Sequence, residues 1–402
     1  MDEHLEELGE LADTAGATVV GQITQQIDRP HAGTYLGKGK IEELTRLLEE
    51  KEASLVLFDD ELSPAQGKNI EDATGRRVMD RAELILDIFA TRARSSEAKM
   101  QVELAQLQYM LPRLTRMWTH LEKFRGGIGV RGPGETQLET DRRLIGHRIK
   151  LLRERLVDVQ RQRVVQRQGR RGTFRASLVG YTNAGKSSVL RSLSGASEIF
   201  VEDRLFATLD PLTREVSLGE GQPVLVTDTV GFIRKLPHHL VASFRATLEE
   251  VGEADLLLHV IDASHPVWEE HRLVVDQVLG ELGALSKPVL HVFNKTDRLS
   301  PEQFQALRER VNNLLPNSVL VSALAPKGLA PLAEELRLRA RALRPISEVR
   351  ISMSDGRLLA ELHRGGEVLE QRSEGDELVL TARVDAALAG RLRQQGAGVT
   401  TA

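Results

Sequence analysis

The run GYTNAGKSS, from Gly180 to Ser188, has the spacing G-x-x-x-x-G-K-S and directly follows the apolar segment RASLV. Between a strand and a helix, this pattern predicts a loop whose backbone N–H groups surround the phosphates of a nucleotide. We expect Lys186 to neutralise the β- and γ-phosphates and the Ser187 hydroxyl to bind Mg²⁺. The expected nucleotide contacts in this loop are Gly180, Tyr181, Thr182, Asn183, Ala184, Gly185, Lys186, Ser187 and Ser188.

Two segments downstream of this loop are suited to hold Mg²⁺ and the γ-phosphate. In DTVGF, Asp228 ends an apolar run and can hold Mg²⁺ through water, while Gly231 offers a backbone N–H to the γ-phosphate. In LFATLDPLTR, we expect Thr208 to close on the metal and the phosphate, with Thr213 as the alternative. Phe206 of the same segment is included among the expected nucleotide contacts.

The base of the nucleotide is predicted by two later motifs. In NKTD, Asp297 can accept hydrogen bonds from N1–H and the exocyclic amine of guanine, a pattern that adenine does not present. Asn294 and Lys295 are expected to brace this site, and the VSA segment brings the backbone of Ser322 and Ala323 near the guanine O6. The order of the motifs therefore predicts a site for GTP and GDP.

The catalytic prediction rests on Lys186, Thr208, Gly231 and Asn183. Many GTPases carry a glutamine after DxxG that orients the attacking water. Phe232 occupies this position and cannot form that hydrogen bond, so we expect slow intrinsic hydrolysis that a partner accelerates. Asn183 can hold K⁺ beside the phosphates, where the ion would replace an arginine finger, or it can hydrogen-bond its own loop.

A second glycine-rich run, RGGIGVRGPGET at 125–136, is predicted to bind a different kind of phosphate. Its neighbours have the spacing of long helices, whereas a nucleotide loop follows a strand. Flexible glycines beside arginines suit an irregular RNA surface, although the segment could also be mere scaffold. The predicted RNA contacts are Arg125, Gly126, Gly127, Arg131, Gly132, Arg142 and Arg143.

The elements expected to position these motifs give an α/β fold with four parts. Residues 1–81 alternate helix and strand patterns, including the strands ATVVGQI and SLVLFDD, and predict a small parallel α/β subdomain. Because the chain opens on a helix pattern, we expect that the strand before this helix is missing. Residues 82–172 predict a long antiparallel helical hairpin, because apolar residues recur at spacings of four and three from Met100 to Leu121 and from Ile145 to Val159. Pro112 should kink the first arm. Residues 173–343 predict a P-loop G domain, and 344–402 a small α+β domain.

Composition narrows the cellular setting. The chain has no cysteine and no apolar run long enough for a membrane span, so we expect a cytoplasmic protein, with peripheral attachment to a membrane left open. We also expect a monomer. The net charge is −4, yet residues 141–175 hold twelve Lys or Arg against three Asp or Glu, a local balance of +9. Such a run is typical of polyanion binding, although it could also be a solvated helix face.

Five phrases in sequence order resemble the HflX family of GTPases: GTYLGKGKIEEL, GGIGVRGPGETQLETDRR, GYTNAGKSS, LFATLDP and DTVGFIRKLPHHL. The resemblance covers roughly residues 10–365, and the hydrophobic residue after DxxG belongs to the family pattern. It implies a GTPase that binds the large (50S) ribosomal subunit and splits stalled or idle ribosomes under stress such as heat. It also implies that the hairpin tip reaches ribosomal RNA and that the ribosome stimulates hydrolysis.

The sequence is also compatible with two other functions. One is a signalling switch that docks protein partners through the hairpin, and another is a GTPase of the tRNA-modification type. The stretch GTYLGKGK, with Gly33, Gly37 and Gly39, resembles a phosphate-binding turn but is also typical of a structural loop. A second nucleotide site in the N-terminal subdomain therefore stays open.

Overall fold

The computed structural model describes residues 2–26, 29–114, 133–168, 173–196, 204–218, 223–236, 250–342 and 344–401, with the side chains of the long helix α7 described from 138 to 162. Internal contacts divide the chain into two compact units. The first unit comprises 1–161, 202–210 and 230–248, and the second comprises 162–201, 211–229 and 249–402. Two short pieces of the predicted G domain thus belong to the first unit.

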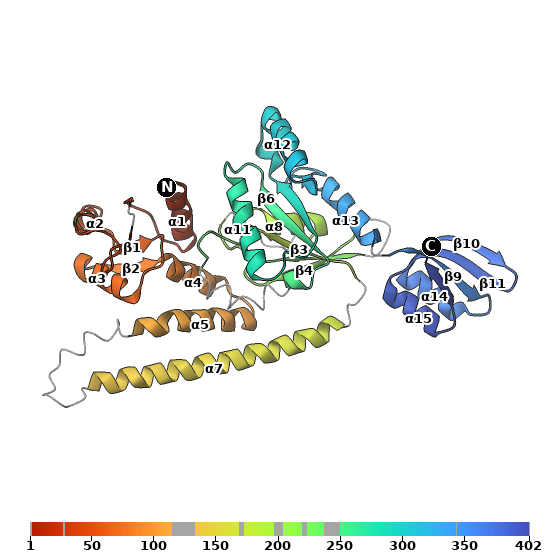
Figure 1. Ribbon diagram of the computed structural model, residues 1–402, viewed down its shortest axis with the longest axis horizontal. Helices are drawn as coiled ribbons and strands as arrows, with labels where there is room; N and C mark the ends of the chain where they lie inside the picture. The colour runs from red at the N-terminus through yellow and green to blue at the C-terminus, as the bar shows by residue number, and fades with distance from the viewer. Residues whose placement is uncertain are drawn as a thin grey trace. The chain divides into compact units, whose positions relative to one another are not determined.

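The first unit begins with alternating helices and strands (Figure 1), in the order α1 (Asp2–Thr14), α2 (Lys38–Glu50), β1 (Leu55–Phe58), α3 (Pro64–Thr74), β2 (Arg77–Asp80) and α4 (Arg81–Arg92). β1 and β2 pair in parallel, in agreement with the small parallel subdomain predicted for residues 1–81. Helix α3 was not predicted, although its signals are local. Ser63 and Gln66 form a capping box and Gly75 ends the helix in the left-handed conformation.

The predicted strand ATVVGQI is not part of a β-ladder. Residues 17–25 have no ladder partner among the described residues, because β1 pairs only with β2 there. Val19 and Val20 are each about half exposed as a result. This segment, α1, α2 and β1 line a cavity of about 780 Å³. The strand prediction was wrong because apolar alternation sets a face but does not supply a hydrogen-bonding neighbour.

Helices α5 (Ser96–Met110) and α7 (Pro133–Gln168) lie side by side in Figure 1, with the 3-10 turn η1 (Leu111–Arg113) after α5. Their apolar stripes meet: Leu104 packs with Ile149 and Leu152 in a buried cluster. This packing confirms the hairpin seam over the described residues. The α-helix ends at Met110 and Pro112 lies in η1, consistent with the missing N–H of proline.

The second unit contains a six-stranded sheet in the order β4-β5-β3-β6-β7-β8, in which only β4 runs antiparallel to its neighbour. Its strands are β3 (Arg175–Gly180), β4 (Leu212–Val216), β5 (Val224–Asp228), β6 (Leu256–Asp262), β7 (Val289–Asn294) and β8 (Ser318–Leu320). The five parallel strands agree with the P-loop G domain predicted for this part of the chain. The edge strand β4 was not predicted; it overlaps the end of LFATLDPLTR, for which the sequence predicts a role in nucleotide binding.

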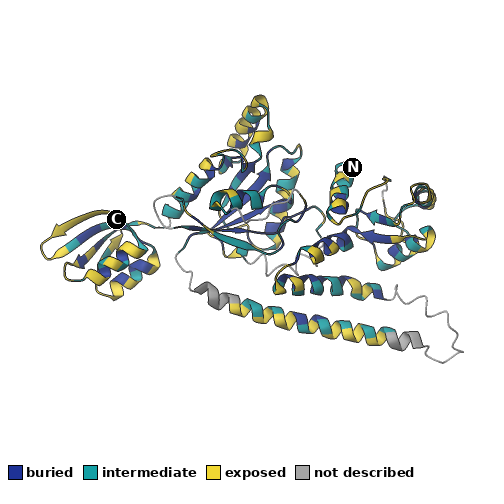
Figure 2. Ribbon diagram, turned by 180° about the vertical axis from the view of Figure 1, so that it is seen from behind, coloured by how far each residue is buried: buried dark blue, intermediate teal, exposed yellow. Residues whose placement is uncertain are grey.

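Helices cover both faces of this sheet (Figure 1); they are α8 (Lys186–Ser194), α11 (Trp268–Glu281), α12 (Pro301–Leu314) and α13 (Ala330–Ala342), and the 3-10 turn η2 (Thr296–Arg298) follows β7. Residues of α8 and α13 share one apolar cluster with Leu258 and Val260 of β6. Trp268 of α11 and residues of α12 pack instead with Ile261, which points to the other face. Because both faces are covered, the central strands are buried nearly throughout (Figure 2).

The C-terminal part runs β9 (Ile346–Ser352), α14 (Gly356–Gly365), β10 (Glu367–Glu374), β11 (Glu377–Arg383), α15 (Ala386–Gln394) and β12 (Gly398–Thr401). The strand order β10-β11-β9-β12 is that of a split βαβ, ferredoxin-like fold. The α+β prediction is therefore confirmed, although α15 and β12 were not foreseen. The outward sheet face carries ion pairs between Arg350, Arg372 and neighbouring glutamates, so it is polar. In the part of the chain that the structure describes, no helix is long and apolar enough to cross a membrane.

Candidate nucleotide site

The loop GYTNAGKSS joins the end of β3 to the first turn of α8, as its pattern requires. A side chain at Gly180 would collide with the carbonyl oxygen of Val260 in β6. A side chain at Gly185 would collide with the amide of Asn294, and its φ of +95° is a conformation that favours glycine. The loop also carries Tyr181, Thr182, Asn183, Ala184 and Ser188, of which Asn183 is exposed in the left-handed conformation.

Lys186 is buried at the start of α8, and its ammonium group turns back into the loop. Its Nζ donates hydrogen bonds to the carbonyl oxygens of Tyr181 at 2.9 Å and of Gly180 at 3.2 Å. The pKa of Lys186 is lowered to about 8, mainly by burial; the charge of Asp228 opposes the shift and that of Lys295 adds to it. The positive charge is therefore only partly compensated by the protein, which suits a group that meets phosphate oxygens.

Ser187 and Asp228 meet at the C-terminal edge of the sheet. The Ser187 hydroxyl donates to Oδ2 of Asp228 at 2.6 Å, and Asp228 ends β5 beside Leu178 of β3. A hydroxyl and a carboxylate next to a phosphate loop are the hard oxygen donors that Mg²⁺ prefers. The residues present therefore fit Mg²⁺, which would supply charge neutralisation between the phosphates.

The predicted guanine residues also lie together. The side chain of Asn294 donates to the carbonyl oxygen of Ala184 at 3.1 Å and accepts from the backbone N–H of Ala323 at 3.0 Å, which ties the phosphate loop to the VSA segment. The Ser322 hydroxyl donates to Asp297. Lys295 forms an ion pair with Asp262 at 2.7 Å. The Ser322 hydroxyl thus fixes one carboxylate oxygen of Asp297.

The two segments expected to contact the γ-phosphate, around Thr208 and Gly231, belong to the first unit, whereas the loop belongs to the second. Thr213, the alternative to Thr208, lies on β4. Its hydroxyl is 2.9 Å from that of Thr227 on β5, so it forms a hydrogen bond between two strands of the sheet. Phe206 is 2% exposed and packs edge to face on Phe89 of α4. The ring therefore lies in the apolar core of the first unit, and the nucleotide contact of Phe206 stays a prediction.

Charged residues attach the segment after Gly231 to the N-terminal elements. Lys235 lies 2.6 Å from both Asp59 and Asp60, which follow β1. Burial alone would lower the pKa of Lys235, but its hydrogen bonds to the two carboxylates raise it overall. Arg234 pairs with Glu3, and Phe232 is fully buried. Within the first unit, this segment is therefore fixed by side chains far away in sequence.

Of the predicted RNA contacts, Arg125, Gly126, Gly127, Arg131 and Gly132 lie outside the described residues. Arg142 and Arg143 are exposed on α7. Sequence reasoning missed Asp262 and the residues after it, although an aspartate ending the strand between DTVGF and NKTD was a usable signal. Its position at the edge where parallel strands end places it near the other motifs.

A parallel sheet with a phosphate loop at its carboxyl edge, a Ser–Asp pair for Mg²⁺ and an NKxD base site defines the class of P-loop GTPases. Three family models match the chain in succession: "GTP-binding GTPase N-terminal" over residues 2–90, "GTP-binding GTPase Middle Region" over 92–170 and "50S ribosome-binding GTPase" over 175–295.

Similar proteins give the finer grouping. A GTPase HflX of Magnetococcus marinus is 46% identical over 97% of this chain and 90% of its own length. The GTPase HflX of Escherichia coli is 45% identical over 90% of this chain and 85% of its own length. The chain belongs to the HflX family of GTPases. A crystal structure of a GTP-binding protein from Sulfolobus solfataricus with GDP is 26% identical, with a TM-score of 0.46 over 85% of this chain and 96% of that one.

Proposed function

We propose that this GTPase binds the large ribosomal subunit in its GTP form, splits stalled or idle 70S ribosomes in the cytoplasm, and is stimulated in hydrolysis by the ribosome. The observation that carries the proposal is the basic surface of α7. Arg142, Arg143 and Arg153 are exposed there and form no salt bridge with another described residue. Arginines on a long helix that keep their charge available are suited to the phosphates of RNA.

The length of α7 supports the same proposal. A helix of 36 residues spans about 54 Å at about 1.5 Å per residue. The inner side of α7 packs on α5, whereas much of its remaining surface is exposed (Figure 2). The glycine-rich run 125–136 precedes and begins this helix, so we assign ribosomal RNA contacts to it and to Arg142 and Arg143. The description "50S ribosome-binding GTPase" of the matching family model favours the same partner.

The ion requirements belong to this proposal. We assign Mg²⁺ to Ser187, Thr208 and Asp228, and K⁺ to Asn183. The 2.6 Å contact between Ser187 and Asp228 supports the first assignment. The exposed, left-handed Asn183 at the loop surface supports the second, since its side chain forms no hydrogen bond to the described residues that would compete with an ion.

The test is cosedimentation with purified 50S subunits, with a non-hydrolysable GTP analogue and with GDP, at several salt concentrations. We expect binding in the GTP-analogue state that weakens with salt. Replacing Arg142, Arg143 and Arg153 with glutamine should reduce the slope of log affinity against log salt by about 1 per lost phosphate contact. In a splitting assay with 70S ribosomes, the α7 variant should likewise be less active than the wild type.

The matched control replaces three exposed arginines of the second unit, Arg308, Arg357 and Arg364, with glutamine. It removes the same charge from the whole protein and should leave binding unchanged. Equal, salt-insensitive binding in both nucleotide states would contradict the proposal. Normal 50S binding by the α7 variant would instead favour a switch that docks proteins.

A further inference from the structure

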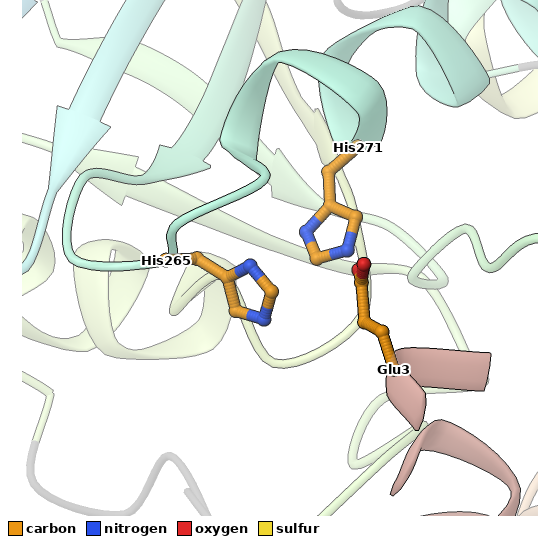
Figure 3. Close-up of side chains that lie close together, drawn as sticks. All are labelled: Glu3, His265 and His271. Atoms are coloured by element: carbon orange, nitrogen blue, oxygen red, sulfur yellow. The ribbon is translucent and has the colours of Figure 1, made fainter. Parts of the chain in front are cut away.

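A stack of two aromatic rings, with a third ring tilted against it, lies at the phosphate loop. The Tyr181 ring lies parallel to the His271 ring, with centroids 3.8 Å apart and an angle of 5°. The ring of His265 also contacts the His271 ring, with centroids 4.3 Å apart and an angle of 40° between the ring planes (Figure 3). Tyr181 is a loop residue, His271 lies on α11, and His265 lies between β6 and α11. All three belong to the second unit.

The stack acts on a loop residue that holds the phosphate-binding lysine. Tyr181 is 6% exposed, and its carbonyl oxygen accepts the shorter of the two hydrogen bonds from Lys186. A side chain whose ring is clamped restricts the backbone that carries it. The ring contact with His271 and the hydrogen bond from Lys186 therefore meet in one residue, Tyr181.

The same histidines connect to the guanine end of the site. Asp262 ends β6, forms the ion pair with Lys295 of NKTD, and accepts hydrogen bonds from the N–H and hydroxyl of Ser264 at 2.9 and 2.6 Å. The backbone N–H of His265 donates to the carbonyl oxygen of Asp262 at 3.3 Å. A continuous set of contacts therefore runs from the base site to the phosphate loop.

We propose that His271, backed by His265, is a positioning residue that orients Tyr181 and thereby Lys186 for the nucleotide phosphates. Lys186 meets the phosphates both before and during hydrolysis. Loss of the stack therefore weakens ground state and transition state alike, which raises KM and leaves kcat unchanged. The stack also makes the phosphate loop depend on the same strand end that braces the guanine site.

The experiment measures dissociation rates of fluorescent GDP and of a fluorescent non-hydrolysable GTP analogue by stopped flow. An aromatic pair is worth a factor of about 2 to 12, so His271→Ala should release both nucleotides about 2- to 12-fold faster and raise KM by a similar factor. His271→Phe keeps a planar ring and should restore rates to within about 2-fold of the wild type. Leu273→Ala, at an exposed position on the same helix, is the matched control.

A double-mutant cycle isolates the contact. If His271 acts through Tyr181, then His271→Ala in a Tyr181→Ala background should add no further acceleration. Independent, multiplicative effects in the cycle would overturn the proposal. So would His271→Phe releasing nucleotide as fast as His271→Ala at an equal melting temperature, or a His271→Ala protein that melts earlier but binds nucleotide normally.

Discussion

Asp210 and Ser95 are joined by two hydrogen bonds across 115 residues of sequence: the carboxylate accepts the backbone N–H of Ser95 at 3.1 Å and the hydroxyl of the same residue. The N–H of Arg94 donates to the same carboxylate at 3.0 Å. Asp210 thus occupies the positive end of α5, where backbone N–H groups lack helical partners. Since Thr208 is two residues away, the start of the hairpin arm anchors a segment that we assign to the γ-phosphate.

Ser95→Ala is expected to weaken both α5 and this anchor. The Ser95 hydroxyl also accepts from the backbone N–H of Ala98 at 3.0 Å, so the variant loses a helix cap worth about 1 kcal/mol of unfolding free energy. GTP hydrolysis should slow, because the Thr208 segment is held less firmly. Ser95→Thr keeps the hydroxyl and should behave as wild type in denaturant melts and in turnover. Normal turnover by Ser95→Ala would show that the anchor has no influence on hydrolysis.

Nucleotide binding should depend on pH through Lys186. Its pKa of about 8 in the free protein should rise when phosphate oxygens bind, because an opposite charge favours the protonated form. The dissociation constant for GDP should therefore be constant below about pH 8 and increase above it, by up to about tenfold per pH unit. Isothermal titration between about pH 7 and 9 measures this dependence.

Two variants accompany that titration. Lys186→Ala should abolish nucleotide binding or turnover, and wild-type GTPase activity in it would contradict the assignment of the site. Lys186→Arg keeps its charge throughout this pH range, so any binding it retains should be independent of pH. A flat wild-type profile would mean that Lys186 keeps its proton throughout.

Gly185→Ala should disrupt the site from within. Its Cβ would collide with the amide of Asn294, which bridges Ala184 and Ala323, and the left-handed backbone adds strain of about 1 kcal/mol or more. We expect loss of GDP binding and a lower melting temperature. Gly195→Ala is the control, since that glycine has φ +66° with open space around it. This control has the same backbone strain without the collision. Equal GDP affinity in the two variants would therefore contradict the idea that the Asn294 contacts to Ala184 and Ala323 support GDP binding.

Acid stability should depend on His259. This residue is buried on β6, faced by His291 on β7 and by Arg272 and Asp276 on α11; burial holds its pKa well below the usual value, with His291 and Arg272 adding to the shift. In the unfolded chain His259 binds a proton near pH 6.5, whereas in the folded chain it stays neutral at that pH. The unfolding free energy is therefore highest above about pH 6.5 and falls below it. In His259→Leu, the unfolding free energy measured by urea melts should depend less on pH between about pH 5 and 7. His363→Gln, at an exposed site, should not, and an unchanged slope in His259→Leu would refute the assignment.

Potassium should accelerate hydrolysis if Asn183 holds the ion. Replacing Na⁺ by K⁺ at constant ionic strength should raise kcat in the wild type, because a cation beside the phosphates stabilises the developing charge. Asn183→Ala should lose this response and retain GDP affinity to within about 2-fold. A wild-type rate that is the same in both salts would dispose of the assignment.

The sequence by itself determined the chemistry of the site and most of the sheet. Motifs such as GYTNAGKSS and NKTD carry their function in residue type and spacing, and parallel strands bring them to one edge whatever the surrounding contacts. Buried strands and seam residues such as Leu104 and Ile149 were predictable for the same reason, since hydrophobic period reports which face is covered.

Tertiary structure alone decided the rest. ATVVGQI has a strand pattern but no partner among the described residues, and the Phe206 ring packs on Phe89. The contacts of Asp210 with Ser95, of Lys235 with Asp59 and of His271 with Tyr181 join residues far apart in the chain. Such pairs leave no period or spacing in the sequence, because their proximity arises only when separate elements pack against one another.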